Sequence, residues 1–226
     1  LMLCEALYQA SQGYPVGIAS LEMSSDQCYR RIACNRADVS MYALDHGIAG
    51  TGQEARALNS LVEVSKMPLY VSEQSHTPES LASWARRQVM KNGIQILWVD
   101  YLQILCPSQR YSGMTERITD FSGMMLRLRK QLKIPVVVLS QLSRLSDREN
   151  RPPKLSDLRD SGAIEQDAHT VIFVSDHQDE AMKDDLSVVS VDKNRDGALG
   201  RGELKKNFAR QRFEEMDIQP GGSYEQ

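Results

Sequence analysis

Short apolar segments alternate with long helical patterns through most of this 226-residue chain, and this alternation limits the folds open to it. The segments are apolar at nearly every position, as strands buried on both faces are. The helical patterns between them reach a dozen residues or more, long enough to cross over between parallel strands. We therefore predict an α/β fold with a mainly parallel sheet and helices on both faces. We expect strands over 15–20, 68–72, 94–100, 134–140, 170–175 and 186–192, and helices over 24–37, 52–66, 77–93 and 114–132.

Composition and charge argue against several classes of protein. The net charge of −3 does not suit a surface coated in basic residues for nucleic acid, although it is compatible with a local basic loop. No apolar run approaches the ~18 residues of a membrane span, and no leader pattern opens the chain. The four cysteines have no Cys-x-x-Cys spacing, so we expect neither a zinc site nor a disulfide scaffold. These features favour the reduced setting of the cytoplasm.

The first residues already follow a helical pattern. Leu3, Leu7 and Ala10 share one face, and Gly13 is a typical helix end. No capping residue precedes Leu1. We therefore expect that the chain has been cut from a longer one.

Polar side chains end three of the predicted strands. Glu22 follows the first strand, Asp100 ends the third and Gln141 follows the fourth. Ligands of open α/β sheets bind at the carboxyl ends of the strands. An apolar strand that ends in Asp is typical of the Walker B motif, whose carboxylate holds Mg²⁺, and equally of a helix cap or a turn. Together, the three side chains favour a sheet that hydrolyses a nucleoside triphosphate.

Five motifs occur in order along the chain. They are Leu-Glu-Met-Ser at 21–24, Val-Asp-Tyr-Leu-Gln at 99–103, Leu-Ser-Gln-Leu-Ser-Arg at 139–144, Asp-Leu-Arg-Asp-Ser-Gly-Ala-Ile-Glu-Gln-Asp at 157–167 and Lys-Asn-Arg-Asp-Gly at 193–197. This series resembles the C-terminal RecA-like ATPase domain of DnaB-type replicative DNA helicases. The resemblance implies one RecA-like motor domain over 1–220, built on a P-loop NTPase sheet, and a disordered tail over 221–226.

The resemblance also implies a role for each matching side chain. Glu22 would be the general base that activates the attacking water, and Asp100 the Walker B ligand of Mg²⁺ bound with ATP. Gln141 would couple the γ-phosphate to the loops that contact DNA. Lys193 and Arg195 would reach the ATP site of the neighbouring subunit, Arg195 as an arginine finger, because a planar guanidinium spreads its charge over several phosphate oxygens. ATP and Mg²⁺ are the implied cofactors.

The implied partners are single-stranded DNA and further copies of the chain in a homo-hexamer. Arg159, Asp160 and Gly162 belong to a loop that the family points at the DNA backbone in the central channel. Residues 144–159 hold five basic side chains and residues 144–160 hold four acidic ones, so the expected DNA contact depends on the resemblance and not on charge. Primase and a helicase loader are further implied partners, and no membrane is implied.

The chain departs from the family in its phosphate-binding loop. The pattern Gly-x-x-x-x-Gly-Lys-Ser/Thr cradles phosphates in P-loop proteins, and no Gly-Lys pair occurs in the 226 residues. By the spacing back from Leu21, this loop would end just before Leu1. The glycines at 47, 50 and 52 do not replace it, since no Lys follows them, and we expect a surface turn there. We therefore predict that the chain alone binds ATP poorly or not at all and is inactive.

Two other functions stay open beside a motor that couples ATP hydrolysis to movement on single-stranded DNA and duplex unwinding. One is another RecA-like ATPase, of the recombinase or circadian-clock kind. The other is a non-catalytic relative that binds single-stranded DNA or associates with the ring. The motifs at 139–144 and 157–167 favour the helicase over the other ATPases.

A calcium loop and a metal site are the remaining alternatives. Asp192 to Glu203 match the calcium-loop pattern at every required position. The segment before them is strand-like, whereas that motif needs an entering helix, and we set calcium binding aside. The four histidines lack the spacing of metal ligands, and we expect Cys28, Cys34 and Trp98 to be core residues.

Overall fold

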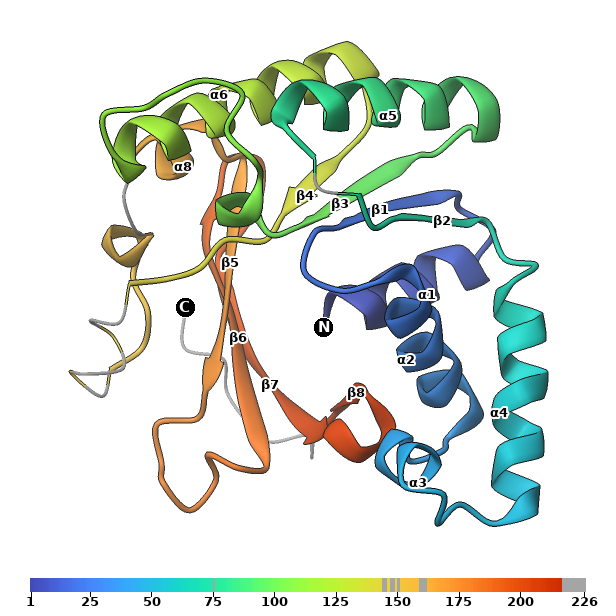
Figure 1. Cartoon of the computed structure of the whole chain (residues 1–226). Helices are drawn as coiled ribbons and strands as arrows, with labels where there is room; N and C mark the ends of the chain where they lie inside the picture. Colours follow the sequence, from blue (N-terminus) through green and yellow to red (C-terminus); the bar gives the residue numbers. More distant parts are fainter. Residues whose placement is uncertain (75, 144–145, 147–148, 150, 159–161, 217–226) are drawn as a thin grey trace.

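The computed structural model describes residues 1–74, 76–143, 146, 149, 151–158 and 162–216. The six predicted strands, together with two that were not predicted, β7 and β8, form two four-stranded sheets. The first sheet has the order β2-β1-β3-β4 with parallel neighbours, and the second has the order β5-β6-β7-β8 with antiparallel neighbours (Figure 1). The strands are β1 Val16–Ser20, β2 Leu69–Ser72, β3 Ile96–Asp100, β4 Val136–Val138, β5 Thr170–Asp176, β6 Leu186–Asn194, β7 Gly200–Asn207 and β8 Arg212–Glu215.

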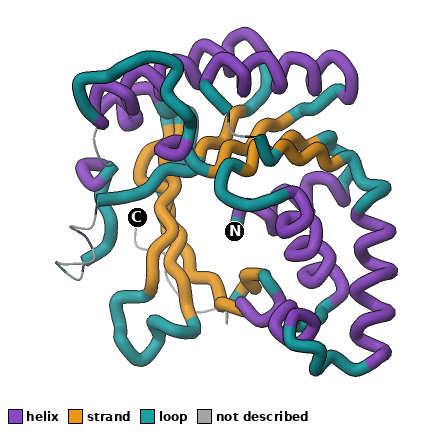
Figure 2. Tube along the Cα trace, in the orientation of Figure 1, coloured by secondary structure: helices purple, strands orange, loops and turns teal. Residues whose placement is uncertain are grey.

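Helices cover both faces of the parallel sheet, as Figure 2 shows. Helices α5 and α6 lie on one face, and α1 and α2 lie on the other, with α4 packed against α2. The helices are α1 Met2–Ser11, α2 Ser25–Ala37, α3 Met41–Asp45, α4 Thr51–Val64, α5 Pro78–Asn92, α6 Met114–Leu132 and α8 Gly162–Asp167, with 3₁₀ turns η1 Leu102–Ile104, η2 Leu155–Asp157 and η3 Phe208–Arg210. The predicted α/β class with helices on both faces is therefore confirmed.

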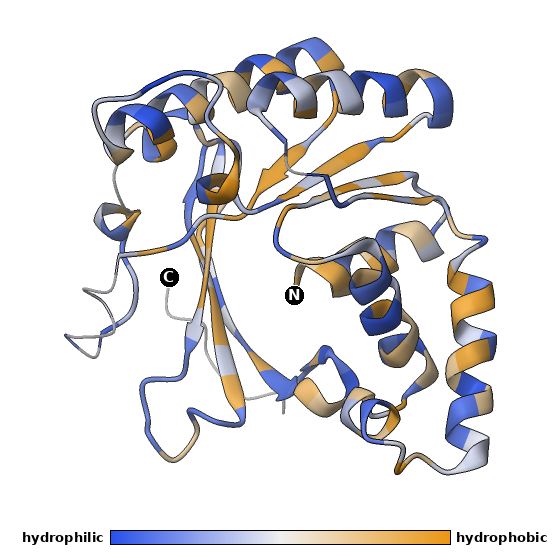
Figure 3. Ribbon diagram, viewed as in Figure 1, coloured by the Kyte–Doolittle hydropathy of each residue, from blue (hydrophilic) through white to orange (hydrophobic). Residues whose placement is uncertain are grey.

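Burial on both faces explains why the central strands are apolar throughout. Val16 and Ile18 of β1 pack with α1 and α2, whereas Ala19 packs with α5 and α6. In β3, Leu97 and Val99 also face α5 and α6. The strands of this sheet accordingly stand out as hydrophobic in Figure 3, while the helices are striped.

Local sequence signals set the ends of the helices beside the sheet edge. Ser24 and Gln27 form a reciprocal capping box that starts α2 directly after β1. Thr77 caps α5, with Pro78 in its first turn. Gly93 ends α5 at φ +64°, a left-handed conformation that glycine adopts without a steric cost.

The second sheet is antiparallel, although its first two strands were expected from apolar runs like those of the parallel sheet. Residues 177–185, between β5 and β6, are too few for a crossover helix, so the chain must return as a hairpin. β5 buries Val171 and Phe173 and exposes Ile172 and Val174, the alternation typical of a sheet with one covered face.

The end of the second sheet returns to the helices beside the parallel sheet. The main-chain carbonyl of Gln211 accepts from the Asn35 side chain at 3.0 Å, and its side chain accepts from Arg31 at 2.9 Å. Arg210 and Arg212 both pair with Asp38, which follows α2. These contacts join the two sheets through α2 as well as through the chain.

Several further expectations can be compared with the structure. The fourth strand is shorter than the 134–140 we predicted, and the short helix α3 was not predicted. The glycine-rich residues 47–52 form the exposed link from α3 to the first turn of α4, as expected of a surface turn. Among the described helices, none combines the length and the apolar character that a membrane crossing needs. The predicted tail at 221–226 lies outside the described residues.

Candidate functional site at the carboxyl edge of the sheet

The two predicted carboxylates meet at the carboxyl edge of the parallel sheet. Ser20, the last residue of β1, is paired with Asp100, the last residue of β3. The N–H of Leu21 donates to the carbonyl of Asp100 at 2.9 Å, which extends this pairing by one residue. Glu22 follows immediately and is exposed. The parallel register therefore brings together Glu22 and Asp100, which are 78 positions apart in the sequence.

A tight turn holds Glu22 between β1 and α2. The buried hydroxyl of Ser20 donates to the carbonyl of Met23 at 2.7 Å and accepts from its N–H at 3.3 Å. The thiol of Cys28, fully buried as predicted, donates to the same hydroxyl oxygen at 3.5 Å. These contacts fix the main chain on both sides of Glu22, while its side chain stays in solvent.

Burial and charge both act on Asp100. Its carboxyl group is partly buried, and this burial raises its pKa above the ordinary value, with the negative charge of Glu22 acting in the same direction. The amino group of Leu1 opposes this by attracting the carboxylate. The amino end of α1 is thus close enough to Asp100 for the two charges to interact.

The donors at this edge suit a magnesium ion. Mg²⁺ prefers carboxylate oxygens and usually keeps several waters, with one or two carboxylates and substrate phosphates completing its shell. Within the described residues, no group of three or more His, Cys, Asp or Glu side chains could cage a metal. Asp100, with Glu22 beside it, thus fits an ion that arrives with phosphates better than one held by protein alone.

Gln141 lies at the same edge, beyond β4. Val99 of β3 is paired with Val138 of β4, and Leu139 continues the contact by donating its N–H to the carbonyl of Val99 at 2.9 Å. The Gln141 side chain is exposed, and its main-chain N–H donates to the side-chain oxygen of Gln103 at 3.2 Å. All three predicted strand-end residues, Glu22, Asp100 and Gln141, therefore share one edge of the sheet.

Sequence reasoning missed a further carboxylate at this edge. Glu73 directly follows β2, and its side chain accepts from the N–H of Ser25 in the first turn of α2 at 2.6 Å. Hydrogen bonding from Ser25 lowers the pKa of Glu73. The sequence signal was the same as for Asp100, an apolar strand followed by an acidic residue. The contact shows that Glu73 accepts a hydrogen bond from the N-terminus of α2, where a negative charge is favourable.

Lys193 and Arg195 lie at the end of β6 and not beside the carboxylates. The Lys193 ammonium donates to the carbonyl of Glu165, and the Arg195 guanidinium donates to the carbonyl of Gln166, both in the last turn of α8. Cations bind favourably to the carbonyls at a helix C-terminus. Among the described residues, no carboxylate forms an ion pair with either side chain.

The predicted DNA loop is described only at its borders. Arg159 and Asp160 lie outside the described residues, and Gly162 is the exposed first residue of α8. Before the loop, Asp157 is buried and accepts two hydrogen bonds from Arg151, at 2.6 and 2.9 Å. These bonds lower the pKa of Asp157.

The candidate calcium loop lies in the hairpin between β6 and β7. β6 runs to Asn194, so a strand enters the motif as expected, and no helix precedes it. The side chain of Asn194 donates to the carbonyl of Ala198 at 3.2 Å. Its amide therefore serves the turn of the hairpin.

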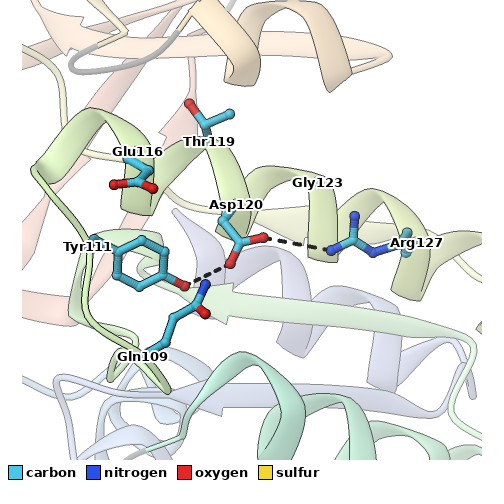
Figure 4. Close-up of a pocket in the computed structure, with 7 residues that line it drawn as sticks. All are labelled: Gln109, Tyr111, Glu116, Thr119, Asp120, Gly123 and Arg127. Atoms are coloured by element: carbon cyan, nitrogen blue, oxygen red, sulfur yellow. Dashed lines mark hydrogen bonds and ion pairs between the residues drawn. The ribbon is translucent and has the colours of Figure 1, made fainter.

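A hollow of about 480 Å³ lies away from the strand ends, on α6 and the loop before it (Figure 4). The hydroxyl of Tyr111 donates to Asp120 at 2.7 Å, and Arg127 approaches the other oxygen of Asp120 at 3.9 Å. None of the predicted site residues that the structure describes lines it. Its lining residues are Gln109, Tyr111, Glu116, Thr119, Asp120, Gly123 and Arg127.

Comparisons with known proteins identify the family of the chain. The family model described as DnaB-like helicase C terminal domain matches residues 1–215. The chain is 34% identical over 206 residues to a "Probable plasmid replicative DNA helicase" of Chlamydia psittaci, covering 89% of this chain and 45% of that protein. It is also 34% identical over 224 residues to "Replicative DNA helicase DnaB" of Haemophilus influenzae, covering 95% and 47%. The chain thus spans about half the length of these relatives.

Solved structures show the same fold. One that is described as an ATPase domain superposes with a TM-score of 0.88 at 24% identity, covering 96% of this chain and 79% of that chain. Another, described as a DnaB-like replicative helicase and its interactions with primase, superposes with a TM-score of 0.87 at 24% identity, covering 96% and 54%. The fold is therefore the RecA-like α/β fold, and with the family match the recombinase and clock alternatives lose their support. The chain belongs to the family of DnaB-like helicase C-terminal domains.

Proposed function

We propose that this chain is the motor of a replicative DNA helicase, which couples ATP hydrolysis to movement along single-stranded DNA and to duplex unwinding. One observation carries the proposal: the parallel register brings Glu22, Asp100 and Gln141 to one edge of the sheet. This edge is where open α/β sheets bind their ligands. The family to which the chain belongs consists of helicase domains, which supports DNA as the substrate.

The proposed division of labour follows from burial and exposure. Asp100, partly buried at the end of β3, would hold Mg²⁺, which neutralises phosphate charge when it is bound. Glu22, exposed on its turn, can approach a water molecule and accept its proton. Gln141 can donate from its side-chain amide to a phosphate oxygen at the same edge.

Lys193 and Arg195 would act on the ATP site of a neighbouring subunit in a homo-hexamer. Their bonds to carbonyls of α8 leave their positive charge without a carboxylate partner among the described residues. A guanidinium held in this way can stabilise charge on phosphoryl oxygens across an interface. α8 begins at Gly162, so the same helix connects the two cations to the end of the proposed DNA loop, in which Arg159, Asp160 and Gly162 would face the phosphate backbone.

The phosphate cradle is the part that the 226 residues do not supply. No Gly-Lys pair is present, and the first turn of α1, beside Asp100, is where a phosphate loop would have to lie. We therefore propose that the chain alone binds ATP poorly and that residues preceding Leu1 in the intact protein provide the loop. The intact protein would work in the cytoplasm with primase and a helicase loader.

The first test is ATP binding by calorimetry in the presence of Mg²⁺. We compare the 226-residue chain with a form extended upstream along its gene. Binding by the extended form alone supports the proposal. Binding by both forms would show that the phosphate site has been misplaced. If neither form binds ATP but both bind single-stranded DNA, the protein is a non-catalytic relative that binds DNA. The absence of a Gly-Lys pair from the 226 residues is the observation that favours this alternative.

The second test separates the roles of Glu22 and Arg195. In the ATP-hydrolysing form, Glu22→Gln is expected to retain nucleotide binding and lose turnover, and Arg195→Ala to lose turnover while the subunit stays folded. Because the two residues would serve the same site from different subunits, mixing the variants should restore part of the activity. A mixture no more active than either variant would argue against action across the interface.

A further inference from the structure

The side chain of Gln103 makes two hydrogen bonds to the segment that carries Gln141. Its oxygen Oε1 accepts from the main-chain N–H of Gln141 at 3.2 Å, and its nitrogen Nε2 donates to the hydroxyl of Ser140 at 2.9 Å. The opposite orientation of the amide would place two donors against each other at Gln141, so the contacts fix the orientation. Gln103 therefore uses both ends of its carboxamide on two consecutive residues after β4.

Gln103 itself is held firmly. It lies in η1, the 3₁₀ turn that directly follows Asp100 and Tyr101. The buried residues Leu102 and Leu105 precede and follow it in the sequence. Its main-chain carbonyl accepts from the guanidinium of Arg117 on α6 at 2.8 Å. The N–H of Leu102 donates to the carbonyl of Leu139 at 2.9 Å, which joins η1 to the end of β4. A side chain with its main chain fixed in this way can in turn fix the main chain of a neighbour.

We propose that Gln103 is a positioning residue for Gln141: its carboxamide sets where the Gln141 side chain begins relative to Asp100. This inference rests on the proposed function only for what Gln141 does with nucleotide. The link between the two residues is a property of the chain itself. The side-chain hydrogen bonds of Gln103 go to Ser140 and Gln141, so we assign it a positioning role and not a catalytic one.

Two substitutions separate the hydrogen bonds from the volume of the side chain. Leucine is close to glutamine in volume but offers neither donor nor acceptor, so Gln103→Leu removes both contacts. Glutamate keeps an oxygen for the N–H of Gln141, and the hydroxyl of Ser140 can rotate to donate to it. The matched control is Gln109→Leu, the same change on an exposed loop residue that lines the hollow in Figure 4.

The direct test is amide hydrogen exchange in the 226-residue chain, which needs no nucleotide. Loss of one hydrogen bond should speed exchange of the Gln141 amide about tenfold in Gln103→Leu. Gln103→Glu and Gln109→Leu should leave it within about twofold of the unaltered chain. The Leu139 amide, bonded to Val99, reports whether the sheet edge stays folded. If Gln103→Leu does not fold, Gln103→Ala serves the same purpose. An unchanged Gln141 amide in a folded variant overturns the proposal.

The functional test is a double-mutant cycle in the ATP-hydrolysing form. Gln103→Leu is expected to lower kcat at least fivefold and to leave KM for ATP within about twofold. Added to Gln141→Ala, it should cause no further loss, because it acts through that residue. Losses that multiply overturn the proposal. If the unaltered protein hydrolyses no ATP, the proposed function fails, and the exchange measurement alone decides the link between Gln103 and Gln141.

Discussion

Gly17 in β1 lies where the parallel sheet has no room for a side chain. A Cβ built at this position would be 2.8 Å from the Cδ1 atom of Ile94, closer than real Cβ contacts, and 3.5 and 3.6 Å from Trp84 and Leu97. Ile94 is 1% exposed, so its Cδ1 atom can move only within the packed interior. Gly17→Ala must therefore displace a packed side chain between β1 and α5.

The size of the effect follows from two opposing contributions. An extra methyl group in a packed core costs ~1–3 kcal/mol. The reduced freedom of alanine in the unfolded chain returns ~0.4–1 kcal/mol. We expect Gly17→Ala to lower the free energy of unfolding by about 1–2 kcal/mol. Ile94→Val removes the clashing Cδ1 atom at a cost of ~0.5–1.5 kcal/mol by itself. In the double variant the new methyl group fills the space left by Cδ1, so the two costs should not add.

Urea denaturation of the 226-residue chain measures each free energy. At a slope of ~2–3 kcal/mol per molar urea, Gly17→Ala should lower the midpoint by roughly 0.5 M. The control is Gly123→Ala on α6, where the nearest atom to a new Cβ is the end of Arg127 at 3.4 Å. There the gain in helix propensity should raise stability by ~0.5–1 kcal/mol. A stable Gly17→Ala variant, or costs that add fully in the double variant, would refute this packing argument.

Three further predictions concern ionisable groups and use the same assay without Mg²⁺. Because the pKa of Asp100 is raised by burial and by Glu22, ionisation destabilises the folded chain, so Asp100→Asn should raise the midpoint at pH 7, with the gain fading as the pH falls toward about 4. The pKa of buried His76 is lowered by burial, so stability should fall as the pH drops below about 6.5, and His76→Asn should flatten that part of the profile. Asp157→Asn removes the negative charge and one of the two oxygens that accept from Arg151, and it should lower the midpoint, most clearly above about pH 4, because the pKa of Asp157 is lowered in the folded chain.

Most of the parallel sheet could be predicted from the sequence because its strands are buried on both faces. β1 and β3 read as apolar runs, and the caps at Ser24, Thr77 and Gly93 mark the helices around them. The separation of the second sheet could not be predicted in this way. The apolar character of a strand does not indicate which other strand it pairs with. The informative feature was the link over 177–185, which is too short for a crossover helix and therefore indicates a hairpin.

The strand-end residues were predictable because parallel strands share a carboxyl edge, so Glu22, Asp100 and Gln141 could be grouped from the sequence alone. The contact of Gln103 with Gln141 was not predictable. Gln103 belongs to a 3₁₀ turn, and no period in the sequence reveals which backbone amide a turn side chain will meet. Glu73 follows a strand as Asp100 does, but its contact with the first turn of α2 depends on how that helix packs beside β2, which no local pattern reveals.

The positions of Lys193 and Arg195 show where reasoning from topology ends. Antiparallel strands end at opposite edges in turn, so the shared-edge argument that groups the carboxylates does not extend to the end of β6. The contacts with α8 supply what topology lacks, since both cations bind carbonyls of the helix that begins at Gly162. The carboxylates and the cations of one chain thus occupy separate structural units, the edge of the parallel sheet and the end of α8. In the proposed function a second subunit would bring these two kinds of charge together, and this is the arrangement that mixing Glu22→Gln and Arg195→Ala subunits tests.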